Sequence, residues 1–535
     1  MFRSISKKIQ FLKLLHQNPN PSGNSHDFPD FSQTQLTNNL NKNLSLLQDI
    51  LGHSNDVNIR EFCFGNQGKI KALLIFIDGL VDARIINESI LRPLMYNSRF
   101  IDSGGKVTTD PLREIERSML SVGNIKRINR VGDIVHNILS GSTALLIDSF
   151  CEAVIISTRG WETRGVQESK TDSIVRGPRE GFSENLRANT ALLRRKIKSP
   201  DLIIESRTLG KKTQTDICIA YLKTVVNPRL IKEIKRRLEQ IKTDAILESG
   251  YIEQFIEDNP LSPFPSIDNN EKPDIIAAKI LEGRAAILVD GTPFVLTMPM
   301  VLIENFQSAG DYYSRPYYTS VVRIIRYIAF LVGILAPAAY VALTTYHQEL
   351  LPTPLLITMA ASREGTPFPA MIEALAMGVV FEILREAGVR LPRPVGQAIS
   401  IVGALVIGES AVSAGLITAP MVIVVAFTAI CSFVVPALYD VQVIIRVILV
   451  ILAGFLGEFG IFIGLLGLLV HLCALQSFGT PYLSPLAPLN PSGLKDVFVR
   501  APLWLMSNRS RGMGEWDPLR QAFRLMPQQP EKDNE

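Results

Sequence analysis

Four glutamates stand out in the second half of the chain because the segments around them are otherwise almost free of charge. They are Glu373, Glu382, Glu409 and Glu458. A carboxylate at membrane depth costs about 2.5–3.5 kcal/mol on insertion scales, so it normally faces a cavity or a partner. Arg385 follows Glu382 by three residues, which favours an ion pair on one helix. For all four, the sequence is equally compatible with an aqueous path and with interhelical hydrogen bonding.

The remainder of the sequence offers no constellation typical of an enzyme. It contains no P-loop, no GxGxxG after a strand and no GxSxG, and the six histidines show no metal-ligand spacing. Five scattered cysteines form no CxxC pair, which favours a reducing compartment for the soluble part. A net charge of +4 is too small to indicate nucleic-acid binding. We therefore expect no catalytic residue, no metal and no cofactor.

A change in composition along the chain predicts the helices that carry these glutamates. Residues 1–316 are dense in Lys, Arg, Asp and Glu, whereas 324–345 and 396–475 are nearly free of them. A bilayer core of about 30 Å needs roughly 20 apolar residues in a helix. A multi-pass helical transmembrane domain is therefore expected over 317–477. Its apolar segments are 321–346, 367–384, 398–417, 421–438 and 443–475.

The orientation of these segments follows from the positive residues that flank them. The soluble region, the loop 385–394, Arg446 and the tail 478–535 all carry positive charge that favours the cytosolic side. Five simple spans would leave the tail outside. The 33-residue run 443–475 is long for one span and short for two. Either this run bends back or another segment does not span, and the sequence leaves both open.

Four glycines in this last run recur at helical spacing. Gly457, Gly460, Gly464 and Gly467 follow i, i+3, i+7 and i+10. Small residues on one helix face allow close approach of a neighbouring helix. We expect these glycines to serve helix packing.

The first 44 residues are predicted to be an extension outside the folded domains. Residues 2–15 form a basic amphipathic pattern without the apolar core of a signal peptide, compatible with a helix on an anionic membrane surface or a solvated helix. Residues 17–44 have the Asn-, Ser- and Pro-rich composition of a linker. Without a cleavable signal, the soluble region is expected to remain cytosolic.

The sequence of the soluble region indicates one structural unit that occurs twice. Residues 71–90 and 216–235 share an apolar strand, a turn and a helical pattern at an offset of 145 residues. In 142–156 and 284–298, two apolar strands flank a turn at an offset of 142, with Asp148 and Asp290 in the same place. The pattern predicts two related α/β subdomains, 45–165 and 166–316. Shared hairpin chemistry is the alternative explanation.

Several short motifs, in order and at their spacing, identify a family resemblance that covers residues 60–485. Together these motifs resemble the A subunit of the GerA-type spore germinant receptors of endospore-forming bacteria. The motifs are VRGP at 175–178, NLRANTALLRR at 185–195, DNPLSPFP at 258–265, DYY at 311–313, HQELLP at 347–352, SREGTPFPAMIEAL at 362–375, LREAGVRLPRPVGQ at 384–397 and SFGTPY at 477–482.

The resemblance implies a spore germination receptor subunit in the inner membrane of the spore. It implies membrane lipid as surroundings, and two partners: a transporter-like, nutrient-binding B subunit and a lipoprotein C subunit. It also implies a homo-oligomeric ring, a pentamer, that forms a nutrient-gated ion channel. A non-conducting scaffold or signal-transducing subunit and a secondary transporter are the alternatives, although transporters usually carry inverted repeats of spans, and we find none.

The resemblance also suggests a role for the short apolar stretch 355–364. If it is helical, Ile357, Ala361 and Glu364 share one face. In a ring, that face would place an apolar constriction beside a ring of carboxylates, which suits gating by dewetting and cation preference. Glu373 follows closely and is the fourth pore or gate candidate. A half-buried turn outside the membrane fits the stretch equally well.

Overall fold

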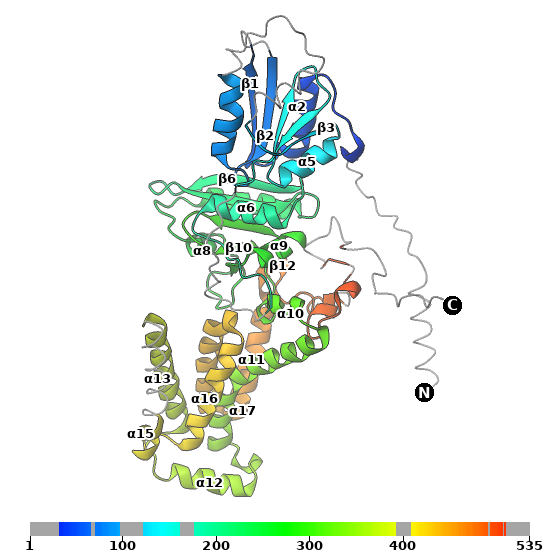
Figure 1. The fold of residues 1–535 in the computed structure, drawn as a ribbon. Helices are drawn as coiled ribbons and strands as arrows, with labels where there is room; N and C mark the ends of the chain where they lie inside the picture. Colours follow the sequence, from blue (N-terminus) through cyan, green and yellow to red (C-terminus); the bar gives the residue numbers. More distant parts are fainter. Residues whose placement is uncertain are drawn as a thin grey trace, which may run out of the picture. The chain divides into compact units, whose positions relative to one another are not determined.

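The computed structural model describes residues 31–65, 70–96, 121–160, 176–391, 408–490, 493–506, 508–509 and 520. The chain divides into two compact units (Figure 1). The first comprises Met1–Leu47, Ile59–Ile77 and Val81–Arg159, and the second comprises Gln48–Asn58, Asp78–Leu80 and Gly160–Glu535. The second unit holds both an α/β subdomain and the apolar helices.

The first unit is built on a five-stranded sheet in the order β1-β2-β4-β5-β3. Every residue of β4 and β5 is buried, because helices pack against the sheet and apolar runs such as that of β2 lie at its centre. The strands are β1 (Val57–Phe64), β2 (Ile70–Ile77), β3 (Ile125–Ile128), β4 (Thr143–Ile147) and β5 (Ala153–Ile156), and the helices are α2 (Leu40–Leu51), Ile85–Leu91 with α3 (Arg92–Met95), and α5 (Val131–Leu139).

The α/β subdomain of the second unit has a sheet in the order β6-β7-β9-β10-β8. One face packs on α6 and α9, and the other on α7 and α8, so its central strands are buried on both sides. The strands are β6 (Leu202–Leu209), β7 (Thr215–Leu222), β8 (Asp268–Asn270), β9 (Ala285–Val289) and β10 (Val295–Met298), and the helices are α6 (Leu186–Lys196), α7 (Pro228–Gln240), α8 (Ser249–Ile256) and α9 (Pro273–Leu281).

The two sheets match strand for strand and register for register. Ala72 of β2 pairs with Ile147 of β4, and Ile217 of β7 pairs with Val289 of β9, at the predicted offsets of 145 and 142 residues. In both, the turn aspartate accepts a hydrogen bond from the first residue of a helix: Asp148 from Leu40 at 3.3 Å, and Asp290 from Leu186 at 3.1 Å. The predicted pair of related α/β subdomains is confirmed.

The first subdomain begins earlier than the sequence indicated. Helix α2 starts at Leu40, and Asn43 is buried and hydrogen-bonded to the backbone of Thr37. Asn189 makes the same pair of bonds with Ser183 in the second subdomain. Residues 31–44 therefore belong to the repeated unit and not to an extension. The predicted amphipathic segment 2–15 lies outside the described residues.

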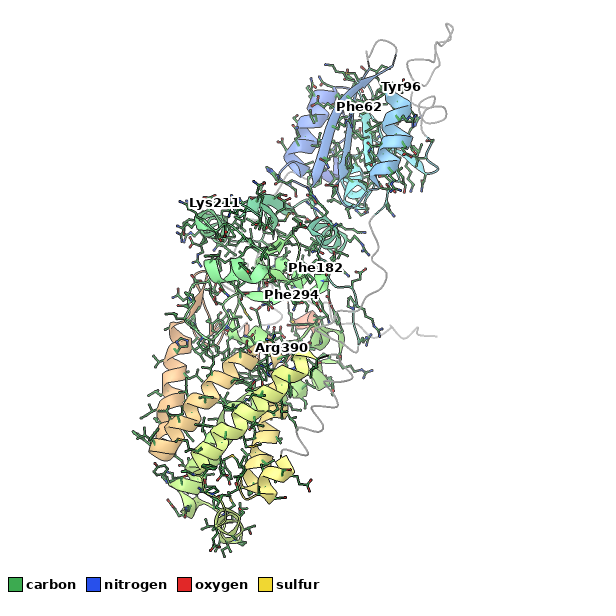
Figure 2. The ribbon with its side chains drawn as sticks, turned by 90° about the vertical axis from the view of Figure 1, so that its left-hand side faces the viewer. Phe62, Tyr96, Phe182, Lys211, Phe294 and Arg390 are labelled. Carbon is green, nitrogen blue, oxygen red and sulfur yellow. The ribbon has the colours of Figure 1, made fainter. Side chains whose placement is uncertain are left out.

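The remaining helices form an apolar bundle. They are α11 (Pro316–Thr345), α12 (Thr353–Arg363), α13 (Ala370–Arg390), α15 (Gly408–Ser413), α16 (Ala419–Val434) and α17 (Tyr439–Ala474). Within the described residues, two stretches are long and apolar enough to cross a membrane, Pro316–Thr345 and Pro436–Ala474. The core of the bundle lies between α11, α13, α16 and α17. Arg390 lies at the end of α13 remote from α12 (Figure 2).

Helix α17 folds back on itself at Gly457. The backbone there has φ 62° and ψ −142°, which is accessible essentially only to glycine. A Cβ at Gly460 would lie 2.2 Å from the carbonyl oxygen of Leu452, although eight residues span about 12 Å in a straight helix. A Cβ at Gly464 would lie 2.5 Å from the side chain of Leu449. The run 443–475 therefore bends back as two antiparallel arms.

This reversal corrects the prediction of one continuous glycine face. Gly457 forms the turn, while Gly460 and Gly464 allow the returning arm to approach the first. A Cβ at Gly467 would meet nothing within 4 Å. The spacing i, i+3, i+7 and i+10 thus combines a turn, two contact positions and one open position.

Candidate functional site

The predicted gate stretch is a helix whose candidate face is exposed among the described residues. Helix α12 runs from Thr353 to Arg363, preceded by Pro352, and Glu364 is its C-cap residue. Ile357 is 64% exposed, and Ala361 and Glu364 are also exposed. Met359 is the buried residue of this helix. The three candidates therefore lie together on a surface that the described residues leave uncovered.

Glu373 lies on α13 but serves the start of α16. Its Oε2 atom accepts hydrogen bonds from the backbone N–H of Thr418 at 3.1 Å and from the Thr418 hydroxyl at 3.0 Å. Thr418 is the N-cap residue of α16, so a negative charge lies at the positive end of that helix. Glu373 is 1% exposed. Its contacts are those of a buried interhelical cap.

Glu382 lies toward the other end of α13. It accepts hydrogen bonds from Arg385 Nε at 3.0 Å and from the hydroxyl of Tyr439, the first residue of α17, at 2.7 Å. The Arg385 guanidinium stacks 4.1 Å above the Tyr439 ring. The expected pair on one helix is present, and Tyr439 extends it to a second helix.

Glu409 and Glu458 are exposed and lie near helix ends. Glu409 is in the first turn of α15, and Glu458 follows the turn at Gly457. That turn packs on Tyr346, the residue that ends α11. Glu458 lies near the middle of the apolar run 443–475, but this run reverses at Gly457, so Glu458 lies at the start of the second arm.

From the sequence we interpreted Arg446 as part of a loop on the cytosolic side, and that interpretation is wrong. It is a buried residue of α17 that packs between α11 and α16. Its Nε donates to the Gly333 carbonyl at 3.0 Å and its Nη2 to the Ser432 hydroxyl at 2.6 Å. Pro337, four residues after Gly333, was the signal available in the sequence, because it leaves that carbonyl without a helical donor.

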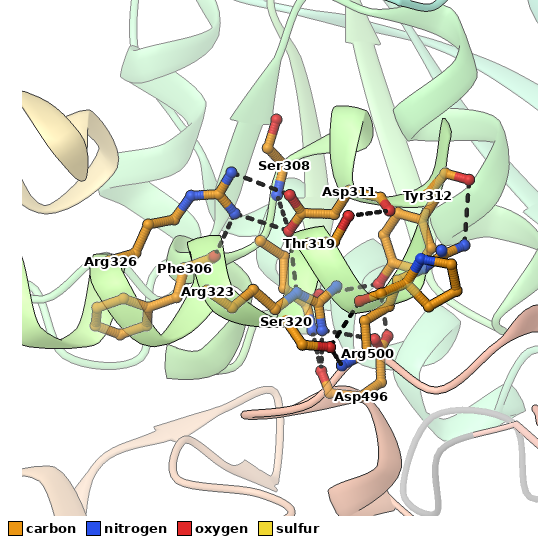
Figure 3. Close-up of polar contacts among 12 residues, drawn as sticks. Phe306, Ser308, Asp311, Tyr312, Thr319, Ser320, Arg323, Arg326, Asp496 and Arg500 are labelled. Carbon is orange, nitrogen blue, oxygen red and sulfur yellow. Dashed lines mark hydrogen bonds and ion pairs between the residues drawn. The ribbon is translucent and has the colours of Figure 1, made fainter. Parts of the chain in front are cut away.

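A buried ion network joins the start of α11 to the segments on either side of it (Figure 3). Asp311 accepts hydrogen bonds from Arg323 Nε at 3.0 Å and from Arg326 Nη1 at 2.7 Å. Arg323 also donates to Asp496 Oδ1 at 2.6 Å. The Tyr312 hydroxyl donates to Asp496 Oδ2 at 2.6 Å. Asp311 and Tyr312 belong to the DYY motif, so this motif fixes α11 to the C-terminal segment.

A second junction joins two other motifs that are 220 residues apart. Phe478 donates its N–H to Asp258 Oδ2 at 2.5 Å, and Arg237 donates to Asp258 Oδ1 at 2.5 Å. The Arg237 guanidinium lies 4.4 Å from the Phe478 ring centroid. Ser262 and His471 are hydrogen-bonded at 2.9 Å. The end of α17 is therefore held on the second α/β subdomain by the DNPLSPFP and SFGTPY motifs.

Two groups in the segment before α11, Glu304 and Tyr312, have shifted pKa values. Burial disfavours ionisation of Glu304, but Arg284, to which it is paired, and Lys279 outweigh burial and lower its pKa. Burial and the neighbouring Asp496 raise the pKa of Tyr312, so its hydroxyl keeps the proton that it donates. These ion pairs and hydrogen bonds fix the groups that they join, and buried atoms such as Arg284 Nε and Arg323 Nη2 have no hydrogen-bond partner among the described residues.

The described residues contain no group of three or more His, Cys, Asp or Glu placed to hold a metal ion. In the second unit, ion pairs and hydrogen bonds join the α/β subdomain to an apolar helical bundle. This is the class of protein in which an α/β module is joined to a bundle of apolar helices.

The chain belongs to the family described as Bacillus/Clostridium GerA spore germination protein, whose model matches residues 45–512. It is 44% identical to spore germination protein KA of Bacillus subtilis (strain 168), over 92% of this chain and 90% of that protein. It is 42% identical to the uncharacterized membrane protein YfkQ of the same organism, over 91% and 95%. The predicted GerA-type A-subunit family is thereby confirmed, and with it the expectation of a receptor subunit in place of an enzyme.

Among solved structures, one match is the N-terminal domain of the A subunit of the Bacillus megaterium spore germinant receptor GerK3. It is 35% identical with a TM-score of 0.40, and the match covers 50% of this chain and 98% of that one.

Proposed function

We propose that this chain forms an oligomeric, nutrient-gated cation channel in the inner membrane of the spore. The observation that carries the proposal is the open face of α12, where Ile357 and Ala361 leave apolar surface beside Glu364. In a closed ring, such faces would line a common axis. Apolar constrictions gate by dewetting and acidic rings favour cations.

The proposed topology has six passes. Helices α11, α13 and α16 supply three, the predicted span 398–417 a fourth, and the two arms of α17 the last two; residues 398–407 lie outside the described part of the chain. Each α17 arm has about 17 residues, about 26 Å of helix, close to the thickness of a bilayer core. Six passes return the basic tail to the side on which the chain starts, in agreement with the positive-inside rule.

The proposed partners are those of a germinant receptor: a B subunit that binds the nutrient and a C subunit that is a lipoprotein. The two junctions support a relay role for this chain, since they fix the soluble subdomain to both α11 and α17. A nutrient signal that moved the subdomain would therefore move those helices together. A homo-pentamer is the proposed stoichiometry.

The test is conductance of the purified full-length protein in liposomes. Ile357→Ala is expected to raise basal ion leak, and Glu364→Gln to reduce the preference for cations over anions. Leu355→Ala is the matched control, because Leu355 is an exposed apolar residue on the opposite face of α12. Equal effects of Ile357→Ala and Leu355→Ala would remove this face from the pore.

A non-conducting scaffold or transducer is the second candidate, and the paired junctions favour it. It predicts no conductance from the purified chain, alone or with its partners. A secondary transporter would instead accumulate a solute without channel-like currents.

A further inference from the structure

The C-terminal segment 493–506 lies along the first turns of α11. Besides the Arg323–Asp496 ion pair, Arg500 donates its backbone N–H to the Ser320 hydroxyl at 3.1 Å. Phe498 packs on Tyr327 with ring centroids 5.1 Å apart. The contacted residues of α11 run from Ser320 to Tyr327, about two turns of the helix, so the segment is held in one position and does not hang free as a tail.

Arg500 is the main anchor of this segment. It is buried, and its guanidinium donates to the carbonyl oxygens of Ser314 at 3.0 Å and Tyr312 at 3.2 Å. It thereby satisfies backbone acceptors at the end of the short helix α10 (Ala309–Tyr313). The polar side of the segment therefore forms hydrogen bonds within the chain.

The opposite side of the segment is apolar and exposed. Phe498 is 45% exposed and Val499 57%, and Leu503 and Leu505 are similarly open. The adjoining face of α11 is open as well, with Tyr317 86% exposed and Tyr318, Val321 and Ile324 also exposed. The Phe498–Tyr327 contact joins the two surfaces.

The occupant that fits this surface is lipid. The exposed face continues along α11, a helix long and apolar enough to cross a membrane, at the end where it enters. Aromatic residues gather at the level of lipid headgroups, and in-plane segments bury their apolar side there while keeping polar groups away from the acyl chains. Tyr317, Tyr318 and Trp504 supply the aromatic residues.

We propose that residues 493–506 form a membrane-interface segment that lies in the headgroup region beside the entry of α11. Phe498, Val499, Leu503 and Leu505 insert at the boundary of the acyl chains. The inference rests on the proposed function in that it requires α11 to span the bilayer. It changes the interpretation of the tail: these residues anchor the cytosolic end of the bundle to lipid.

The test uses Trp504 as a native probe in full-length protein reconstituted into bilayers. Trp161→Phe and Trp516→Phe leave Trp504 as the single tryptophan. Lipids brominated close to the headgroup should quench its fluorescence about twofold or more, and lipids brominated near the bilayer centre should quench it less.

Two controls use a variant that lacks all three native tryptophans. Phe462→Trp, on the exposed face of the second α17 arm, reports lipid contact of the bundle, and Tyr251→Trp, on the exposed face of α8, reports the soluble subdomain. The proposal is overturned if Trp504 behaves like the α8 probe while the α17 probe is quenched. If neither the α17 probe nor Trp504 is quenched, both this proposal and the proposed membrane topology are wrong. If Trp504 is not quenched and its position cross-links between copies of the chain, the exposed apolar side of the segment is a subunit interface instead.

Discussion

The Nε atom of Arg446 lies 3.0 Å from the carbonyl oxygen of Gly333, the one carbonyl of α11 that Pro337 deprives of its helical donor. In a helix, the N–H of residue i+4 would bond to this oxygen, and proline has none. An unpaired carbonyl in an apolar bundle costs free energy, and a donor from a neighbouring helix removes that cost. Arg446, on α17, therefore stabilises α11 at the point where Pro337 interrupts its backbone hydrogen bonds.

The first prediction is a coupling between Arg446 and Pro337. Arg446→Met should lower the free energy of unfolding by about 1–3 kcal/mol, because it leaves the Gly333 carbonyl without a donor. In a Pro337→Ala background, the restored N–H can bond to Gly333, so the same substitution should cost distinctly less. SDS-induced unfolding of the full-length protein in detergent measures both sides of this double-mutant cycle.

Arg390→Met is the control for loss of a cation, since Arg390 makes an exposed pair with Glu386 on α13 and should contribute less than about 1 kcal/mol. An equal cost of Arg446→Met with and without Pro337 would show that Arg446 acts through some other contact.

The second prediction separates the glycines of α17. Gly460→Ala should prevent the two arms from closing, because its Cβ would meet the Leu452 carbonyl at 2.2 Å and that atom belongs to the backbone. Gly467→Ala adds a methyl group to open space and should stabilise the helix by up to about 1 kcal/mol. Cross-linking of cysteines introduced at 449 and 464 would report arm closure, and similar cross-linking in both variants would contradict the requirement for glycine at 460.

The duplicated α/β subdomains are predictable from sequence because their signals are local. Asp148 and Asp290 lie in equivalent turns, and strand patterns on either side keep the same offsets, so pairing partners follow from alternation and turn chemistry. Helix α2 is not predictable in this way, because its polar composition resembles that of a linker. Its position depends on a hydrogen bond that the N–H of Leu40 donates to Asp148, more than 100 residues away.

The bundle is less predictable, because apolar composition alone does not show where a helix ends. Gly457 sits in a run that reads as one helix, and its reversal depends on packing against Tyr346. Arg446 reads as a flanking positive residue, and its burial depends on a carbonyl freed by a proline on another helix. In the proposed ring, the open face of α12 would contact other subunits, and no pattern within one chain encodes such contacts.

The third prediction concerns the cap of α16. Glu373→Ala should destabilise the protein by about 1–3 kcal/mol, because it removes the acceptor of both the Thr418 N–H and the Thr418 hydroxyl. Thr418→Val keeps the backbone bond and should cost about 1 kcal/mol. Thermal unfolding of the full chain measures both. Glu386→Ala, an exposed glutamate on the same helix, is the control, and a Glu373→Ala effect no larger than it would exclude the capping role.

The fourth prediction concerns Glu253 on α8, within the second α/β subdomain. Burial, with the nearby negative charge of Glu257 adding to it, raises the pKa of Glu253 to about 7. When α8 opens, this pKa returns toward its ordinary value near 4.3. The closed form then binds the proton more tightly than the open form at intermediate pH.

Because the closed form holds the extra proton, protection of α8 should be greatest in acid and should fall as the pH rises through 7, then level off. Hydrogen exchange of the α8 amides in the full-length protein, corrected for the intrinsic exchange rate, measures this slope between pH 5.5 and 8. Glu253→Gln should flatten it, since the amide does not titrate. Glu239→Gln, at an exposed position on α7, should leave the slope unchanged. A slope that persists in Glu253→Gln would mean that another group in the subdomain binds the proton.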